Sequence, residues 1–456
     1  MSSSTVLPEE GDAIVCSVSD DFTAVRLLEV ELTRTLPVLT ETTDLAGQPY
    51  HRAQCLVRLH AQPLGLVEVP LESGQLSATA LAAHIWQTLG AQINSHLRED
   101  GLEPVTTLTE LGLPEGIAPR CIADRERFLA TAPFVSVVIA TRERPHMLQR
   151  CLDGLLAQRY PHYEIIVVDN APLTSTTADL IAQHYQDHPS IRYVREDLPG
   201  LSRARNRGLQ EASGEFLAIT DDDVVIDSHW LLELMRDFQL SERVACVTGM
   251  ILPLEIETKA QVWFEQYGGY NKGFARRLFN KYEHHPGTPL FPYTAGQLGT
   301  GANIAFRTSF LRKIGGFDPA LGTGTPALGG EDLAIFFQIV ALGYTLVYEP
   351  AALLYHPNRR DYEGLRKLMY CYGAGLTAYL MKVLVDNPLR LFDLITRLPY
   401  GLYFTLNSNS PKNNRKLTSY PKELSSLERR GMCYGPFAYI RSKWALRKGH
   451  QSSETR

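Results

Sequence analysis

Residues 216–225 read FLAITDDDVV, an apolar run that ends in three consecutive aspartates. The apolar part, Glu215–Ile219, predicts a strand buried on both faces of a sheet. Because side chains alternate along a strand, Asp221 and Asp223 project to one side and Asp222 to the other. Two carboxylates at one strand end repel each other unless a cation lies between them, and hard oxygen ligands suit Mg²⁺ or Mn²⁺. The alternative is a solvated acidic turn.

The sequence around this run alternates apolar strands with helical segments. The predicted strands are Val135–Ala140, Glu164–Val168, Ile191–Val194 and Glu215–Ile219, and the predicted helices are His146–Gln158, Thr174–Gln186 and Leu201–Ala212. This alternation predicts βαβ units and an α/β fold with a parallel sheet covered on both faces. Ligands of such sheets bind beyond the carboxyl ends of the strands. The polar pairs Thr141-Arg142 and Asp169-Asn170, together with residues 220–223, occupy those positions.

The composition is that of an ordinary globular protein. The chain has 456 residues, 44% hydrophobic and 21% charged, which excludes disordered, collagen-like and coiled-coil proteins. Seven scattered cysteines without a CxxC pair indicate a reducing cytosol and buried structural thiols. Met1–Asp12 lacks the apolar core of a secretory signal, and the apolar stretch Met369–Val385 contains Lys382. We therefore expect no membrane-spanning helix and a cytoplasmic protein.

The chain divides into three predicted units. Residues 1–130 form a small α+β accessory domain with 18 acidic and 8 basic residues, residues 131–360 form the α/β domain, and residues 361–456 form a helical segment. The end of the chain, 407–456, has 11 basic and 3 acidic residues. This basic segment predicts an anionic partner, such as the inner face of a membrane or a phosphorylated acceptor. A solvated tail helix is the alternative.

Within the accessory domain, Gln54–Leu59 and Leu66–Leu71 are predicted strands, and Pro63–Gly65 is the predicted turn between them. A helix capped by Ser77 follows. This region shows no catalytic constellation, so docking, acceptor presentation or oligomerisation are its expected roles.

Two further motifs lie in the α/β domain. The segment GLSRARNRG, residues 200–208, opens a helix with Arg203 and two more arginines. A helix N-terminus with guanidinium groups favours an anionic ligand, although an ordinary basic helix face has the same pattern. The segment GGEDL, residues 329–333, places Glu331 and Asp332 at a helix start, where they serve either as a proton acceptor or as a cap.

Taken in chain order, these motifs resemble those of glycosyltransferase family 2. The segments that carry the resemblance are VSVVIATRER, EIIVVDN, LSRARNRGLQEASGEFLAITDDDVV, GTGANIAFR, IGGFD, GGEDLAIFFQIVALGY and YEPAALLYH. The resemblance covers roughly residues 133–360. It implies an α/β GT-A (Rossmann-like) nucleotide-diphospho-sugar transferase domain, flanked here by a small N-terminal α+β domain and a C-terminal helical segment.

The resemblance also implies roles for individual residues. Donor-binding roles fall on Thr141, Arg142, Asp169, Arg203, Asn206, Asp221, Asp222, Asp223, Gly301 and Asn303. Mn²⁺ or Mg²⁺ would bind Asp221, Asp223 and His356, although a lone histidine is more often structural. Asp332, of the Glu331-Asp332 catalytic pair, would be the general base. The second-strand motif departs from the family's usual Asp-Asp-Gly-Ser, because residues 169–172 read DNAP.

The resemblance predicts an inverting, metal-dependent glycosyltransferase. Its expected donor is a nucleoside-diphosphate sugar, with a UDP-sugar as the first choice. Its expected acceptor is an unidentified hydroxyl group in polysaccharide, glycolipid or other glycoconjugate synthesis, and no nucleic-acid partner is expected. A catalytically degenerate carbohydrate-binding or scaffold protein and a sugar-phosphate nucleotidylyltransferase are the alternatives. The aromatic residues between the motifs are either an acceptor wall or ordinary packing residues; they are Trp263, Tyr267, Tyr270 and Tyr293.

Overall fold

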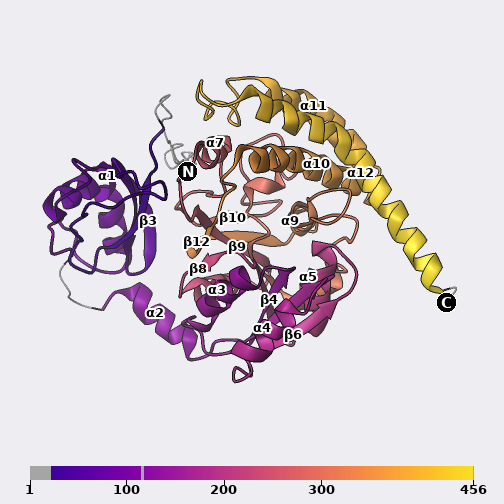
Figure 1. Ribbon diagram of the computed structural model, residues 1–456, viewed down its shortest axis with the longest axis horizontal. Helices are drawn as coiled ribbons and strands as arrows, with labels where there is room; N and C mark the ends of the chain where they lie inside the picture. The colour runs from indigo at the N-terminus through magenta and orange to yellow at the C-terminus, as the bar shows by residue number, and fades with distance from the viewer. Residues whose placement is uncertain (1–21, 114–117, 455–456) are drawn as a thin grey trace.

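One sheet of nine strands organises the α/β domain. The computed structural model describes residues 22–113 and 118–454, so the prediction for Met1–Asp12 lies outside the described residues. The strands run in the order β10-β12-β9-β11-β7-β4-β5-β6, with β8 paired to β12. In Figure 1 the domain that contains α1 and β3 lies at one side of this sheet, and α12 runs past the opposite side.

The half of the sheet from β4 to β7 is parallel. Its elements are β4 (Val135–Thr141), α3 (Pro145–Leu156), β5 (Tyr163–Asn170), α4 (Thr176–His184), β6 (Ile191–Glu196), α5 (Leu201–Glu211) and β7 (Phe216–Asp221). Strand β4 pairs in parallel with both β5 and β7, and β5 pairs in parallel with β6. The predicted order of strands and helices in this half is confirmed.

The other half of the sheet is mixed, so the prediction of a parallel sheet is wrong there. Its elements are β8 (Val225–Ile226), α6 (Trp230–Arg236), η1 (Asp237–Gln239), β9 (Val244–Pro253), α7 (Lys259–Tyr267), β10 (Arg277–Phe279), η2 (Ala295–Gln297), β11 (Asn303–Arg307), α8 (Thr308–Lys313), α9 (Glu331–Ala341) and β12 (Thr345–His356). Strand β11 is antiparallel to both β7 and β9. A strand that is buried on both faces, as β9 is throughout, carries no sequence signal for the direction of its neighbours.

The N-terminal domain is a three-stranded sheet packed against one long helix. Its elements are β1 (Arg26–Glu31), β2 (Arg52–Leu59), β3 (Gln62–Pro70), α1 (Ala78–Glu99) and α2 (Arg120–Leu129). The predicted cap is confirmed, since Ser77 Oγ accepts a hydrogen bond from the Ala80 amide. The predicted turn is wrong: the chain reverses at His60 and Ala61, both with positive φ. Pro63 lies within β3, which is an edge strand and therefore tolerates a missing amide proton.

Two ion pairs join this domain to the α/β domain. Arg58 Nη1 lies 2.6 Å from Asp227 Oδ2, and Arg125 Nε lies 2.6 Å from Glu233 Oε1. All four side chains are at most 10% exposed. Removing one partner of such a pair leaves an uncompensated buried charge, so the contact between the domains is a specific one.

Three helices form the C-terminal segment: α10 (Tyr362–Asp386), α11 (Arg390–Leu406) and α12 (Lys422–Glu454). By length and composition alone, α10 is long and apolar enough to cross a membrane. It packs lengthwise against α12 (Figure 1). Glycine makes this close approach feasible, because a Cβ atom at Gly431 would lie 2.1 Å from the carbonyl oxygen of Tyr370.

The six described cysteines are all free thiols. Cys55, Cys151 and Cys246 are buried as predicted, but Cys433 is exposed. The prediction of uniformly buried thiols is therefore wrong for Cys433, which lies on the outer side of α12, the helix whose glycines face α10. Cys16 lies outside the described residues.

Candidate active site

The structure brings Asp221, Asp223 and His356 together at the carboxyl end of β7. One ligand atom from each of these residues lies within 4.8 Å of the others. His356 Nε2 lies 3.6 Å from Asp223 Oδ1. This is the trio that the sequence assigned to a divalent cation.

Strand pairing explains why these distant residues meet. The short strand β8 follows Asp223 and pairs antiparallel with β12, with Tyr355 opposite Val225. His356 ends β12 and therefore lies beside the residues that precede β8. The cluster thus depends on a two-residue strand that connects the aspartates to the last strand of the domain.

The donor atoms of this cluster fit a divalent cation. Asp223 Oδ1, which faces His356 Nε2, is buried and has no hydrogen-bond partner among the described residues. Unpaired buried polar atoms are rare in folded proteins and require an explanation. Two carboxylates and an imidazole are ligands that Mg²⁺ and Mn²⁺ accept.

Asp222 contacts Thr141 rather than the cation ligands, although it lies in the turn after β7 and not in the strand that the sequence predicted to continue through it. Its Oδ2 accepts a 2.7 Å hydrogen bond from Thr141 Oγ1, and Arg144 lies 3.4 Å from both Asp222 and Asp223. Burial raises the pKa of Asp222 to about 6, against the opposing effect of the Thr141 hydrogen bond. The hydrogen bond between Asp222 and Thr141 therefore holds the ends of β7 and β4 together.

Asp169 lies near the end of β5, the strand next to β4 at the same edge of the sheet. The parallel register places Asp169 beside Thr141, and Asp221 beside Ala140, so the three predicted polar groups share one edge of the sheet. Asp169 is fully buried, and its Oδ2 accepts a hydrogen bond from the Tyr193 hydroxyl at 3.0 Å. Its Oδ1 has no hydrogen-bond partner among the described residues, and burial raises the pKa of the carboxyl group.

Arg205 connects the aspartates to the second acidic motif. Its Nη2 donates to Asp221 Oδ1 at 3.3 Å and to the Gly301 carbonyl oxygen at 2.9 Å, while Nη1 donates to Glu331 Oε1 at 3.1 Å. The Arg205 side chain is only 2% exposed. The sequence analysis grouped Arg205 with Arg203 and Arg207 as guanidinium groups for an anionic ligand, but the structure pairs Arg205 with carboxylates of the protein itself. Nothing in the sequence indicates that it alone of the three is buried.

Asp332 lies next to this connection. The Gly301 amide donates to Asp332 Oδ2 at 2.9 Å. A Cβ atom at Gly301 would lie 3.0 Å from Arg205 Nη1 and 3.2 Å from Asp332 Oδ2, so the close approach favours glycine. Asp332 remains partly exposed whereas Glu331 is buried, and burial together with the neighbouring Asp332 raises the pKa of Glu331. Asp332 is therefore the member of the pair that is open to a substrate.

The side-chain amides of two predicted donor-binding residues form hydrogen bonds with other residues of the protein. Asn303 is fully buried; its Oδ1 accepts from Trp230 Nε1, and its Nδ2 donates to the Met250 and Ala352 carbonyl oxygens. Asn206 bonds the amide and the carbonyl oxygen of Phe317. Both residues hold the framework around the site. Their direct contact with a donor stays a prediction.

The two predicted arginines at the edge are open to solvent. Arg142 is exposed and Arg203 is partly exposed. Their predicted contacts with a donor remain predictions. Glu143, which the sequence analysis did not single out, accepts hydrogen bonds from the Leu173 and Thr174 amides. It thereby links the loop after β4 to the loop after β5.

The aromatic residues named from the sequence separate into two groups. The Tyr270 ring lies 5.2 Å from the His356 ring, and its hydroxyl is hydrogen-bonded to that of Tyr372. Trp263 and Tyr267 pack with α10 in the same cluster. Tyr293 lies elsewhere, with its hydroxyl bonded to Asp393 of α11. Tyr270 is thus the aromatic residue beside the cation ligands.

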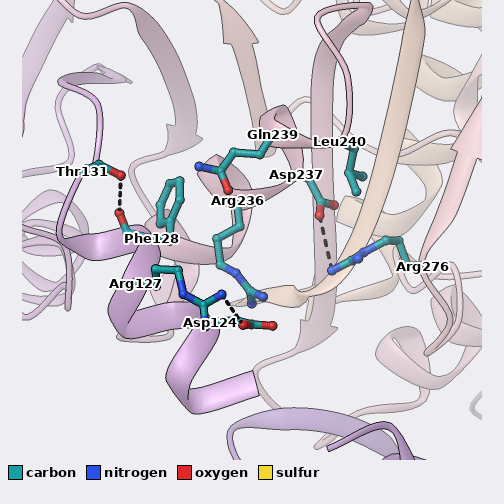
Figure 2. A pocket seen from close by; sticks show the side chains of 9 residues that line it. All are labelled: Asp124, Arg127, Phe128, Thr131, Arg236, Asp237, Gln239, Leu240 and Arg276. Carbon is teal, nitrogen blue, oxygen red and sulfur yellow. Dashed lines mark hydrogen bonds and ion pairs between the residues drawn. The ribbon is translucent and has the colours of Figure 1, made fainter. Parts of the chain in front are cut away.

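A separate cavity of about 450 Å³ lies between α2 and η1 (Figure 2). Arg127 faces Asp124 there, and Arg276 reaches Asp237 at 3.3 Å. The lining contains none of the predicted site residues. These opposite charges largely compensate one another, so we regard this cavity as part of the contact between the domains.

The site thus combines a carboxylate–histidine cluster at the carboxyl edge of the parallel strands with a second acidic pair at a helix start. Residues 136–314 match the family model described as Glycosyl transferase family 2. This match covers less than half of the chain, and it supports the resemblance to glycosyltransferase family 2 that the motifs predicted.

Curated proteins are similar to the chain over part of its length. The O-antigen biosynthesis protein RfbC of Myxococcus xanthus is 26% identical over 300 residues, which cover 61% of this chain and 23% of that protein. The pre-mycofactocin glycosyltransferase of Mycobacterium tuberculosis is 28% identical over 240 residues, which cover 52% of this chain and 46% of that protein. This chain thus spans less than half the length of either relative. The shared domain supports a glycosyltransferase enzyme.

Two solved structures resemble the fold distantly. A mannosyltransferase from Pyrobaculum calidifontis, in complex with GDP-Man and Mn²⁺, has a TM-score of 0.42 and 19% identity, and the match covers 73% of this chain and 86% of that one. GalNAc-T7, with UDP, GalNAc and Mn²⁺, has a TM-score of 0.42 and 17% identity, and the match covers 61% of this chain and 58% of that one.

Replacing Arg205 with methionine tests the buried ion network. The variant leaves Glu331 without its buried counter-ion, so its free energy of unfolding should fall by about 3–5 kcal/mol at neutral pH. The loss should shrink as the pH falls, because the raised pKa of Glu331 lets this carboxyl take up a proton in the folded state. Urea denaturation at neutral and mildly acidic pH measures both effects. The double variant Arg205→Met/Glu331→Gln should recover much of the stability, and an equal loss at both pH values would contradict the pairing.

Proposed function

We propose that this protein is an inverting, metal-dependent glycosyltransferase that moves a sugar from a nucleoside-diphosphate sugar to an acceptor hydroxyl. The observation that carries the proposal is one continuous network. Asp221 and Asp223 meet His356 at the strand end, and Arg205 and Gly301 connect Asp221 to Asp332. A cation site and a proton acceptor therefore lie on the two sides of one guanidinium group.

Asp169 supports a donor with a nucleobase. Its free Oδ1 is a buried acceptor, and the most favourable occupant of such a position is a ligand N–H group. Uracil offers an imide N–H that suits this acceptor, which is compatible with the UDP-sugar that the family resemblance favours. Asp169 lies two strands from Asp221, which corresponds to about 10 Å across the sheet. That span leaves room for a ribose between the base and the cation ligands.

Asp332 is positioned to remove the acceptor proton. Its partly exposed carboxylate is held by the Gly301 amide, so it can accept a proton while the acceptor oxygen attacks the anomeric carbon. A single displacement of this kind inverts the anomeric centre. Arg205 keeps Asp221 and Glu331 fixed on either side during the displacement. A bound Mn²⁺ or Mg²⁺ would be held by Asp221, Asp223 and His356 and would neutralise charge on the diphosphate leaving group.

Lys272 supports an acceptor site on the α7 side of Asp332. Burial lowers the pKa of Lys272 to about 8, and the charges of Arg415, Glu265 and Asp332 act on it. The ring of Tyr270 lies 5.2 Å from the ring of His356, one of the proposed cation ligands. The Lys272 ammonium group and the Tyr270 ring, in the region of the general base Asp332, suit a sugar hydroxyl or a phosphorylated acceptor.

We further propose that the acceptor is presented at a membrane surface, to which α11 binds. All 17 residues of α11 are described, and none is buried. One stripe of the helix carries apolar side chains that are 47–70% exposed: Leu391, Phe392, Ile395, Leu398, Leu402 and Leu406. An exposed amphipathic helix of this kind inserts its apolar face at the lipid interface. Arg441 and Arg447 of the basic helix α12 are exposed and complement anionic lipid.

The first test is a screen of nucleotide sugars, in which binding is detected as a rise in the melting temperature of the protein. UDP-, GDP-, dTDP- and CMP-sugars are each combined with Mn²⁺, Mg²⁺ or EDTA. We expect a metal-dependent stabilisation with UDP-sugars of about 2.7 kcal/mol at 100 times the dissociation constant. Asp223→Asn should remove this shift, and the matched control Asp179→Asn, a change in helix α4, should keep it. No shift with any donor would favour a degenerate scaffold protein.

The second test concerns the proposed general base, Asp332. Asp332→Asn should lower the rate of donor hydrolysis about 10²- to 10⁴-fold, or roughly 3–5 kcal/mol of transition-state stabilisation, because the amide cannot accept the proton. Donor binding, measured by the same thermal shift, should remain within a few-fold of wild type. Unchanged turnover in a folded Asp332→Asn variant would remove this residue from the mechanism.

The third test concerns the membrane. The double variant Ile395→Asp/Leu402→Asp should bind vesicles containing anionic phosphatidylglycerol at least about tenfold more weakly than wild type, because two apolar contacts are lost. Co-sedimentation measures the bound fraction. Leu111→Asp changes an equally apolar residue, 71% exposed, in the N-terminal domain and should bind as wild type does. Equal binding by the double variant would show that α11 is not the docking face.

A further inference from the structure

A second cluster of metal-ligand side chains lies in the N-terminal domain, away from the cation site of the α/β domain. It contains four residues whose ligand atoms all lie within 4.8 Å of one another: His60, His96, Asp100 and Cys121. These side chains supply two imidazole nitrogens, one carboxylate oxygen and one sulfur. That set matches the nitrogen, sulfur and oxygen ligands of tetrahedral Zn²⁺ sites.

The four residues come from three separate elements. His60 lies at the tight turn between β2 and β3, where its φ is +53°. His96 and Asp100 are four residues apart at the end of α1, so they share one face of the helix. Cys121 lies in the first turn of α2. Three elements therefore direct their donor atoms at one point, which requires a specific packing of the turn and both helices.

The geometry within the cluster is crowded around one oxygen atom. Asp100 Oδ2 lies 2.7 Å from His60 Nδ1, 3.1 Å from His96 Nε2 and 2.9 Å from Cys121 Sγ. The two imidazole nitrogens are themselves 3.1 Å apart. In a tetrahedral zinc site with bonds of about 2.0–2.3 Å, ligand atoms lie about 3.3–3.8 Å apart. A small outward movement of the side chains is therefore enough to admit the ion.

The surroundings also suit a structural cation. The side chains of His60, His96 and Asp100 are 7%, 12% and 5% exposed, so water has little access. The site lies at the C-terminus of α1, where the helix dipole is negative and favours a cation. Arg125, which lies beside the cluster, donates to the His60 carbonyl oxygen and is neutralised by Glu233.

We propose that these four side chains form a structural Zn²⁺ site that fixes α2 to the N-terminal domain. With four protein ligands the coordination is complete, so no position is left for a substrate. The ion would join the β2–β3 turn, the end of α1 and the start of α2. Because α2 carries Arg125, which pairs with Glu233 of the α/β domain, the ion also stabilises the contact between the two domains.

Cobalt substitution of the full-length protein tests this site directly. The purified chain is stripped with a chelator and titrated with Co²⁺, and Zn²⁺ is then added as a competitor. We expect one equivalent of tetrahedral Co²⁺ with a thiolate-to-cobalt charge-transfer band, which one equivalent of Zn²⁺ displaces. The measurement needs no variant, so it does not depend on the folding of a mutant.

Matched variants assign the ion to these residues. Cys121→Ser should abolish the charge-transfer band and weaken Zn²⁺ binding at least about 100-fold, whereas Cys371→Ser, another half-buried thiol, should leave both unchanged. Asp223→Asn should retain the band and the zinc equivalent, which separates this site from the proposed catalytic cation. An octahedral cobalt spectrum without a thiolate band, or Zn²⁺ binding weaker than micromolar in the wild type, would overturn the proposal and leave the cluster as a hydrogen-bond network.

Discussion

One buried guanidinium group holds the candidate active site together. Arg205 is almost completely enclosed, and it must keep its partners because an unpaired buried cation costs several kcal/mol. Those partners are the end of β7, the loop that precedes β11 and the start of α9. The position of Asp332 relative to Asp221 is therefore fixed by one side chain, although their elements lie far apart in the sequence.

The sequence was sufficient for the parts of the site that follow from local periodicity. Asp169 lies at the same edge as Asp221 because parallel strands end together. Strand alternation does not account for Asp223, because β7 ends at Asp221 and residues 222–223 form a turn. The contact with His356 was reached only through the family resemblance, since it depends on a two-residue strand that pairs with β12. The role of Arg205 was not predicted, because three arginines at alternate positions of one helix look alike until packing buries one of them.

Asn303 shows a different limit of motif-based assignment. The motif indicates a polar residue near the site, and the structure places it there. Its amide, however, bonds Met250 and Ala352 where the register between β9 and β12 shifts. A break in strand pairing leaves carbonyl oxygens that need donors, and a buried amide side chain supplies them. Whether such a residue faces a ligand or a strand irregularity depends on pairing between strands that are distant in sequence.

The N-terminal domain contacts the segment that directly follows β8, the short strand that positions the cation ligands. Its two buried ion pairs end on Asp227 and Glu233, which flank the start of α6 directly after β8. Hydrogen bonds from His229 and Arg58 lower the pKa of Asp227, so this carboxylate stays ionised and needs its partner. Because β8 pairs with β12 next to His356, movement of the N-terminal domain would strain the pairing that brings His356 to Asp223. The accessory domain is thus mechanically part of the site, even though it contributes no ligand to it.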